Sequence, residues 1–426
     1  MQRGMPAGRR SRARGLAAAL LLAGALGASA AAAVSADAAR SPATGAKARG
    51  QIQLAASVRG YTARRLLART RKRLATRPRP QPRPRPSPVQ PQPSVPAPAP
   101  PALRPAGGFG VSFDNAEYLD AATRNRELDS IAAMGARWVR FDVKWSDVQW
   151  DGQASFNWSK YDPLVDAARA RGLSVLANLA YSPTWARPAG TTDKFGPDTA
   201  ARLSAYAAFA EAAVRRFVGR VSHWELWNEP NIPMFWLPKP NASHYAALIR
   251  AAYPRMKAAD PGAYVLAGAT SPADSDGTRI DEVAFLSAVY ANGGAGHFDG
   301  WSHHPYTVDP SFAHPQNAWW QMAGTSPSIR SVMAANGDGA KQLWGTEFGP
   351  PTSGAPHAMS EAGQAGQITE AYTAWNAYPW AGPLFVYTQR DKRPYGASTD
   401  SFNYYGMLRY DFSPKPVWSV YRALAT

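Results

Sequence analysis

The stretch His223-Trp-Glu-Leu-Trp-Asn-Glu-Pro-Asn231 is an apolar run of strand length with a polar, acidic end. A second stretch of the same kind, Leu343-Trp-Gly-Thr-Glu-Phe-Gly349, places Glu347 118 residues after Glu229. That interval holds about three strand-and-helix units. In a parallel barrel the carboxyl ends of all strands meet at one face, where barrel enzymes place their chemistry. The two stretches therefore predict a barrel with both glutamates at one cleft.

From Gly107 onward, apolar runs of strand length alternate with segments of helical period, which is typical of a parallel α/β architecture. Asp162-Pro163 indicates the start of a helix, and Gly172 indicates its end. Eight runs have strand character: Phe109–Phe113, Arg137–Asp142, Ser174–Leu179, His223–Trp227, Tyr264–Ala269, Gly300–His304, Gln342–Thr346 and Pro383–Thr388. Eight such runs in about 320 residues predict a single (β/α)8 barrel of the TIM type.

Charge and aromatic content divide the chain near residue 106. Residues 1–106 contain 20 of the 47 lysines and arginines but a single acid, Asp37, and every aromatic residue except Tyr61 follows them. The rest of the chain is nearly neutral, with 27 basic and 29 acidic side chains. We therefore expect the folded domain to span residues 107–426. The chain has no cysteine, and a domain of this size needs no disulfide.

The N-terminal residues have the features of an export signal. Arginines precede an Ala/Leu-rich stretch from Gly15 to Val34, which a small-residue site follows at 36–38. We expect residues 1–38 to be a signal peptide and the protein to be secreted or associated with the cell surface. The alternative is an uncleaved anchor, because the stretch is almost long enough to span a bilayer.

Two further segments precede the predicted domain. Residues 39–76 are basic and poor in acids, which favours a disordered segment over a basic amphipathic helix. Residues 77–106 alternate proline with polar and small residues and predict an extended linker. The basic residues within 40–85 suit contact with an anionic cell wall or membrane surface. Nucleic acid is not expected as a partner, because no aromatic residues are interleaved with the charges.

The two glutamates suit the cleavage of a glycosidic bond. The glycosidic oxygen is a poor leaving group and needs a proton, which we assign to Glu229 among Trp224, Trp227 and Pro230. The second carboxylate must attack the anomeric carbon, which we assign to Glu347. The alternative for each glutamate is a structural salt bridge or helix cap. Glu225 is expected to be a structural ion-pairing group inside the barrel.

The two motifs also resemble a known group of enzymes. Trp-Asn-Glu-Pro ending a fourth strand and Thr-Glu-Phe-Gly ending a seventh resemble the acid/base and nucleophile signatures of the large clan of retaining (β/α)8 glycoside hydrolases. The likeness covers residues 107–426 and is greatest to family 39, of endoglycosidase type, and next to the cellulase-like family 5. It implies a secreted glycosidase that cleaves O-glycosidic bonds, of β configuration, in a polysaccharide or glycoconjugate. A transglycosylase and a non-catalytic carbohydrate-binding surface protein stay open as alternatives.

The resemblance implies roles for two polar residues near the strand ends. Asn228 would bond the 2-hydroxyl of the sugar, which requires the chain to bend, because adjacent side chains on a regular strand point to opposite faces. Arg140 would steady the carboxylate of Glu347. The alternative for Arg140 is a salt bridge with Asp142.

The sixth strand ends in His303-His304-Pro305-Tyr306. By resemblance, His304 would contact the substrate or the acid/base, and Tyr306 would donate a hydrogen bond to Glu347. A packed core histidine is the alternative for His303. Paired histidines can indicate a metal, but neighbouring strand residues face opposite sides and no acidic cluster accompanies them. We therefore expect neither metal nor cofactor.

Aromatic residues near strand ends are candidates for stacking on sugar rings, and Trp185, Trp236 and Tyr387 are the strongest. The eighth strand, Phe385-Val-Tyr-Thr-Gln389, lacks the tryptophan that many clan members have there. Tyr387 would take its place.

Overall fold

The computed structural model describes residues 108–306, 318–355 and 357–426. The predicted signal peptide, basic segment and linker lie outside the described residues. None of the described helices combines the length and the apolar character that crossing a membrane requires.

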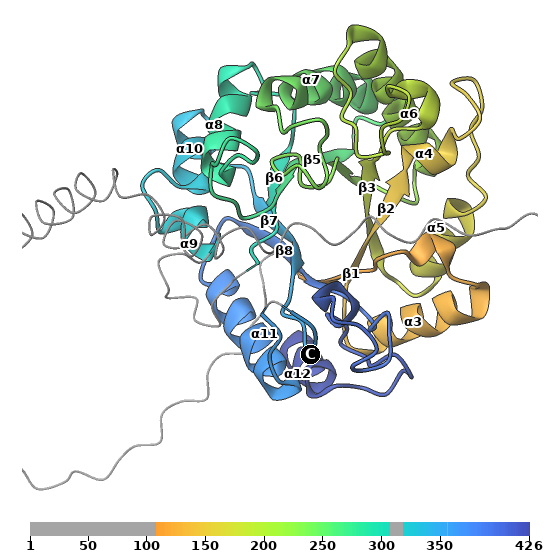
Figure 1. Cartoon of the computed structure of the whole chain (residues 1–426), viewed down its shortest axis with the longest axis vertical. Helices are drawn as coiled ribbons and strands as arrows, with labels where there is room; N and C mark the ends of the chain where they lie inside the picture. The colour runs from red at the N-terminus through yellow and green to blue at the C-terminus, as the bar shows by residue number, and fades with distance from the viewer. Residues whose placement is uncertain (1–107, 307–317, 356) are drawn as a thin grey trace, which may run out of the picture. The chain divides into compact units, whose positions relative to one another are not determined.

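Eight parallel strands close into a barrel in chain order (Figure 1). The barrel closes where Ser112 of the first strand pairs with Tyr387 of the last. The strands are β1 Phe109–Ser112, β2 Trp138–Lys144, β3 Ser174–Ala180, β4 His223–Leu226, β5 Tyr264–Thr270, β6 Gly300–His303, β7 Leu343–Phe348 and β8 Ala381–Tyr387. Each predicted run overlaps one strand and differs from it by at most two residues at either end. The predicted (β/α)8 barrel is confirmed.

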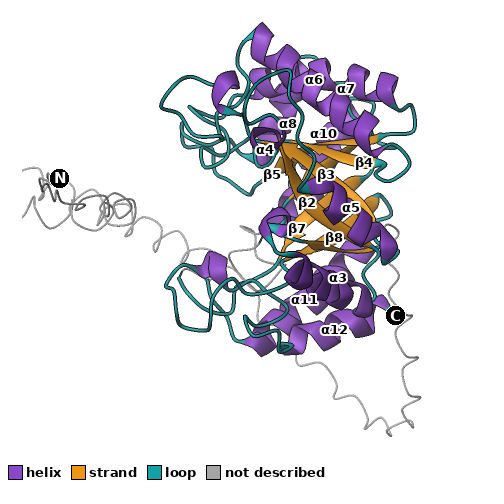
Figure 2. Ribbon diagram, turned by 90° about the vertical axis from the view of Figure 1, so that its right-hand side faces the viewer, coloured by secondary structure: helices purple, strands orange, loops and turns teal. Residues whose placement is uncertain are grey.

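Helices surround the strands (Figure 2). Side chains cap several of them: Asn241 accepts hydrogen bonds from two amides at the start of α7 (Ala242–Ala259), and Asp281 does so at the start of α8 (Glu282–Ala291). The helix predicted from Asp162 begins one residue earlier, at Tyr161. The described α-helices are α3 Ala121–Ala133, α4 Trp145–Val148, α5 Tyr161–Ala170, α6 Ala200–Phe217, α7 Ala242–Ala259, α8 Glu282–Ala291, α9 Ala318–Ala323, α10 Ile329–Ala335, α11 Glu361–Asn376 and α12 Pro416–Ala425, with short 3-10 helices at Ala116–Tyr118, Thr184–Ala186 and Ser401–Asn403.

Large apolar side chains fill one layer of the barrel interior. Leu176, Leu266, Trp344 and Phe385 form this buried cluster, with Trp138 packed against it. Residues two apart on a strand share a face, so the next interior position after Trp138 on β2 is Arg140. The apolar layer is thus a packed floor, and a polar layer follows it toward the carboxyl ends of the strands.

Candidate active site

A cavity of about 820 Å³ opens where the strands end. Every strand or the residues that directly follow it contribute to its lining: Ser112, Asp142, Tyr181, Glu229, Ser271, Tyr306, Glu347 and Tyr387, in chain order. Both predicted catalytic glutamates therefore face one cavity at the carboxyl-terminal face of the barrel, where sites of this fold are built.

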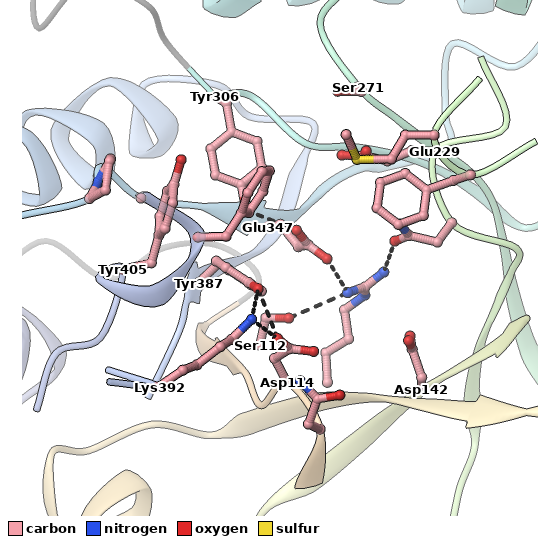
Figure 3. Close-up of a pocket in the computed structure, with 18 of the residues that line it drawn as sticks. Ser112, Asp114, Asp142, Glu229, Ser271, Tyr306, Glu347, Tyr387, Lys392 and Tyr405 are labelled. Carbon is pink, nitrogen blue, oxygen red and sulfur yellow. Dashed lines mark hydrogen bonds and ion pairs between the residues drawn. The ribbon is translucent and has the colours of Figure 1, made fainter. Parts of the chain in front are cut away.

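Arg140 lines this cavity, in which Figure 3 labels Glu229 and Glu347, and is only 2% exposed. Its Nη1 donates to Glu347 Oε1 at 2.6 Å, and its Nη2 donates to Asn228 Oδ1 at 2.9 Å. Its Nε donates to Glu225 Oε2 at 2.7 Å. Burial alone would lower the pKa of Arg140, but the carboxylates of Glu225 and Glu347 outweigh that effect and raise it. The guanidinium stays charged and holds Glu347 in place.

Glu225 is fully buried and has the ion-pairing position predicted for it. Asp142 is not the salt-bridge partner of Arg140: its Oδ1 accepts a hydrogen bond from Asn178 Nδ2 at 2.8 Å. Burial raises the pKa of Asp142, against the effect of the nearby Arg140 and Lys144 charges. Of the two alternatives for Arg140, the contact with Glu347 is the one that the structure contains.

Glu347 is held at both carboxylate oxygens. The hydroxyl of Tyr306 donates to its Oε2 at 2.8 Å, opposite the Arg140 contact at Oε1. The predicted hydrogen bond from Tyr306 is confirmed as a contact. A carboxylate fixed at both oxygens has a defined orientation toward the cavity, as a nucleophile requires.

Glu229 lies three residues beyond the end of β4, in a bent stretch of backbone. The φ angles of Trp227 and Glu229 are 71° and 43°, in the left-handed region that residues other than glycine seldom adopt. The amide of Glu229 donates to the carbonyl of Ala269 at 3.0 Å, which anchors the bend. This bend lets Asn228 and Glu229 both face the cavity, although they are adjacent in sequence. Such strain is found most often at functional sites.

The paired histidines have different environments. His304 Nδ1 lies 2.8 Å from Glu229 Oε1 and 3.6 Å from Glu347 Oε2. Burial would lower the pKa of His304, but the two carboxylates outweigh it and raise it. His303 is instead buried with its Nδ1 3.0 Å from Thr270 Oγ1, and burial lowers its pKa to about 3. His303 is a core residue, and His304 belongs to the site.

An acidic cluster does accompany His304, contrary to expectation. One ligand atom each of Glu229, His304 and Glu347 lies within 4.8 Å of the others, a spacing that could hold a metal ion. The three residues come from different strand ends, so their proximity is a property of barrel closure that the linear sequence does not display. The guanidinium of Arg140, 2.6 Å from Glu347, would repel a cation there.

Two of the three predicted stacking residues do not line the cavity. Trp236 is 1% exposed and packs against Trp227 with ring centroids 5.2 Å apart. Trp185 packs edge-on against Trp145, and its Nε1 donates to the carbonyl of Gln149 at 2.7 Å. Their large apolar surfaces are used in packing, which corrects the prediction for both. Tyr387 does line the cavity, as predicted.

Asp114, Lys392 and Tyr405 are among the lining residues that were not predicted. The hydroxyl of Tyr387 donates to Asp114 Oδ2 at 2.9 Å, and Lys392 forms an ion pair with the same carboxylate. Tyr405 packs edge-on against Tyr387 at 5.5 Å. Asp114 could have been found from its place just beyond β1. Lys392 and Tyr405 belong to the long segment after β8, where no periodic pattern exists.

Similar solved structures share this fold. A family 39 glycoside hydrolase from the gut symbiont Bacteroides cellulosilyticus WH2 matches with a TM-score of 0.60 and 23% identity, over 75% of this chain and 63% of that one. A monomeric beta-xylosidase from Caulobacter crescentus CB15 matches with a TM-score of 0.56 and 21% identity, over 74% of this chain and 67% of that one. At such identities the likeness establishes the fold.

Among curated proteins, Beta-glucosidase 6 of Oryza sativa subsp. japonica is 32% identical over 127 residues, which are 28% of this chain and 24% of that protein. Coniferin beta-glucosidase of Pinus contorta is 26% identical over 110 residues, 25% of this chain and 21% of that protein. The chain thus spans about a quarter of the length of the curated relatives that it matches. No protein-family model matches it.

Proposed function

We propose that this protein is an exported, retaining glycoside hydrolase that cleaves β-O-glycosidic bonds by double displacement. One observation carries the proposal: carboxylate oxygens of Glu229 and Glu347 lie within 4.8 Å of each other at the mouth of the barrel. Retaining enzymes hold the two carboxyl groups about 5–5.5 Å apart, whereas inverting enzymes need about 6.5–9.5 Å to admit a water between them. The short separation supports covalent catalysis.

In the first step, Glu347 attacks the anomeric carbon and forms an ester bond with it. The bond from that carbon to the glycosidic oxygen breaks, its electron pair stays on the oxygen, and the Glu229 carboxyl gives that oxygen its proton. Arg140 and Tyr306 hold the attacking carboxylate in place. His304, bonded to Glu229, orients the acid.

In the second step, water attacks the same carbon and the ester bond breaks, returning its electron pair to Glu347. Glu229, now a carboxylate, takes the proton of the water. The sum is one glycoside and one water converted to a free sugar and an alcohol. Hydrolysis of a β-glycoside agrees with the activities named for similar proteins, which include a beta-xylosidase and beta-glucosidases.

The stereochemistry of the first product tests the proposal. Two displacements at one carbon restore its configuration, so the β-glycoside should release a β-sugar. Proton NMR of the product, recorded before mutarotation, distinguishes the anomers. An α-sugar as the first product would show that Glu347 is not a nucleophile.

A further inference from the structure

The cavity differs in chemistry on the two sides of Glu347. Asp114, Tyr387 and Lys392 form a hydrogen-bonded polar cluster on one side, and Glu229 and Ser271 lie on the other (Figure 3). Under the proposed function, on which this inference rests, the proton of Glu229 goes to the leaving oxygen. The leaving group must therefore depart along the Glu229 side.

The Glu229 side presents an apolar wall, formed by Ile232, Met234, Phe235 and Pro272. These residues come from the segments that follow β4 and β5. Met234 is 57% exposed, so its apolar side chain is accessible to a ligand in the cavity. Ser271, next to Pro272, also lines the cavity.

Lys194 lies beside the wall and contacts an aromatic ring and a carboxylate. The Nζ of Lys194 lies 3.0 Å from the ring centroid of Tyr181 and 5.6 Å from that of Phe235. Its carboxylate partner, Asp193, lies 3.8 Å away. The ammonium of Lys194 thus lies over the Tyr181 ring, at the Phe235 edge of the wall.

The wall is held in place before any ligand binds. The amide of Ile232 donates to the carbonyl of Glu229 at 3.2 Å, and the amide of Phe235 donates to the carbonyl of Ile232 at 3.2 Å. The indole of Trp227 donates to the carbonyl of Phe235 at 2.8 Å. The Phe235 ring also stacks on Tyr181 at 6.5 Å. A fixed apolar surface binds without the cost of ordering it.

We infer that the preferred substrate is a β-glycoside whose leaving group is an apolar alcohol, alkyl or aromatic, and not another sugar. A sugar at this position would bring several hydroxyls against the wall, where the side chains of Ile232, Phe235 and Pro272 cannot form hydrogen bonds. Hydroxyls that lose water without gaining a partner reduce affinity. An alkyl chain or aromatic ring would instead bury apolar surface against Met234 and Phe235.

The test begins with substrates that have no such leaving group. The full chain is assayed on β-glucosyl, β-xylosyl, β-galactosyl and β-mannosyl fluorides, and the glycone that it hydrolyses is identified. The octyl β-glycoside of that glycone is then compared with its 1,4-linked disaccharide. Octanol is intrinsically a poorer leaving group than a sugar hydroxyl, so a higher kcat/KM for the octyl glycoside reports binding at the wall. We expect a preference of about tenfold or more.

Variants of the wall make the test specific. Met234→Ser and Phe235→Ser should each reduce the octyl preference by about tenfold while fluoride hydrolysis stays near that of the unaltered protein. Phe402→Ser is the matched control: Phe402 is also exposed and lines the cavity, but it stacks on Tyr405. It should change hydrolysis of the octyl glycoside and the disaccharide by the same factor.

The possible outcomes distinguish a failure of the apolar leaving-group inference from a failure of the proposed glycosidase function. Fluoride hydrolysis with a preference for the disaccharide, or an octyl preference that survives both wall variants, overturns the apolar leaving group and leaves the glycosidase intact. Hydrolysis of no fluoride overturns both. Because Met234 is largely exposed, its replacement tests the wall even if Phe235→Ser does not fold.

Discussion

At the scale of single residues, Glu347 and Glu229 differ in how they are held. Both oxygens of Glu347 have donors, Arg140 and Tyr306, whereas Glu229 is bonded to His304 in a strained bend of the backbone. These settings suit a fixed nucleophile and an acid whose proton must be delivered to the leaving oxygen. The difference can be measured by removing each carboxyl separately.

Glu347→Ala should reduce hydrolysis by about a thousandfold or more, because no covalent intermediate can form. Added azide should restore turnover by occupying the vacated space, and the product should be a glycosyl azide of inverted configuration. Glu229→Ala is the matched control. It should retain most of its kcat/KM on a dinitrophenyl glycoside, whose leaving group needs no proton in the first step, and lose kcat/KM on an alkyl glycoside. Near-normal hydrolysis of an alkyl glycoside by either variant would contradict the assigned roles.

The buried His303 should make the stability of the folded protein depend on pH. Burial lowers its pKa from 6.5 to about 3, so the folded protein keeps it neutral where the unfolded chain is protonated. The resulting stability is complete above pH 6.5 and is lost as the pH falls toward 3. In that window, the free energy of unfolding should fall by about 1 kcal/mol per pH unit through this residue.

His303→Asn keeps a polar atom near Thr270 but has no titrating ring. Urea unfolding can be measured at pH values from about 7 to about 4. Over this range the free energy of unfolding should decrease less for the variant than for the unaltered protein. A merely structural role for His303 would shift the stability at every pH equally and leave the slope unchanged.

At the scale of elements, a small residue on the first strand faces a large residue on the last strand where the barrel closes. A Cβ at Gly110 of β1 would lie 2.5 Å from the Phe385 ring of β8, so the strand pair leaves no room for a methyl group. Gly110→Ala should lower the free energy of unfolding by about 1–3 kcal/mol through overpacking.

Gly366 is the control for that substitution. It lies inside α11, and a Cβ there would meet nothing within 4 Å. Gly366→Ala should raise the free energy of unfolding by about 0.5–1 kcal/mol, because alanine favours the helix. The two substitutions add the same methyl group, so opposite signs in denaturant unfolding would isolate the packing effect. A small or favourable change at Gly110 would mean that β1 and β8 can move apart.

The strands could be predicted because parallel strands buried on both faces are continuous apolar runs with clear limits. The catalytic pair could be predicted because each glutamate ends such a run. Trp236 could not be placed, because a tryptophan beyond a strand is compatible with both stacking on a sugar and core packing. Lys392 and Tyr405 lie after β8 in a segment of bends and turns, where position depends on tertiary contacts.

At the scale of the whole molecule, charge is distributed unequally along the chain. The formal net charge is +17, and residues 1–106 supply all of it, because the domain that follows has slightly more acids than bases. A basic segment of this kind is attracted to anionic surfaces, and salt screens that attraction. Catalysis and surface retention should therefore reside in different parts of the chain.

A chain shortened to begin at Gly107 tests whether catalysis and surface retention reside in different parts of the chain. The residues that form the barrel and its cavity all lie within 108–426, so the shortened protein should fold and hydrolyse a small soluble glycoside with kcat/KM close to that of the longer one. The protein that begins at residue 39, without the predicted signal peptide, should co-sediment with vesicles that contain about 30% anionic lipid at low salt and be released at about 0.5 M NaCl. The shortened protein should stay in solution under both conditions. Equal sedimentation of the two proteins would place the attraction on the barrel, and failure of the shortened protein to fold would show that residues before Gly107 belong to the domain.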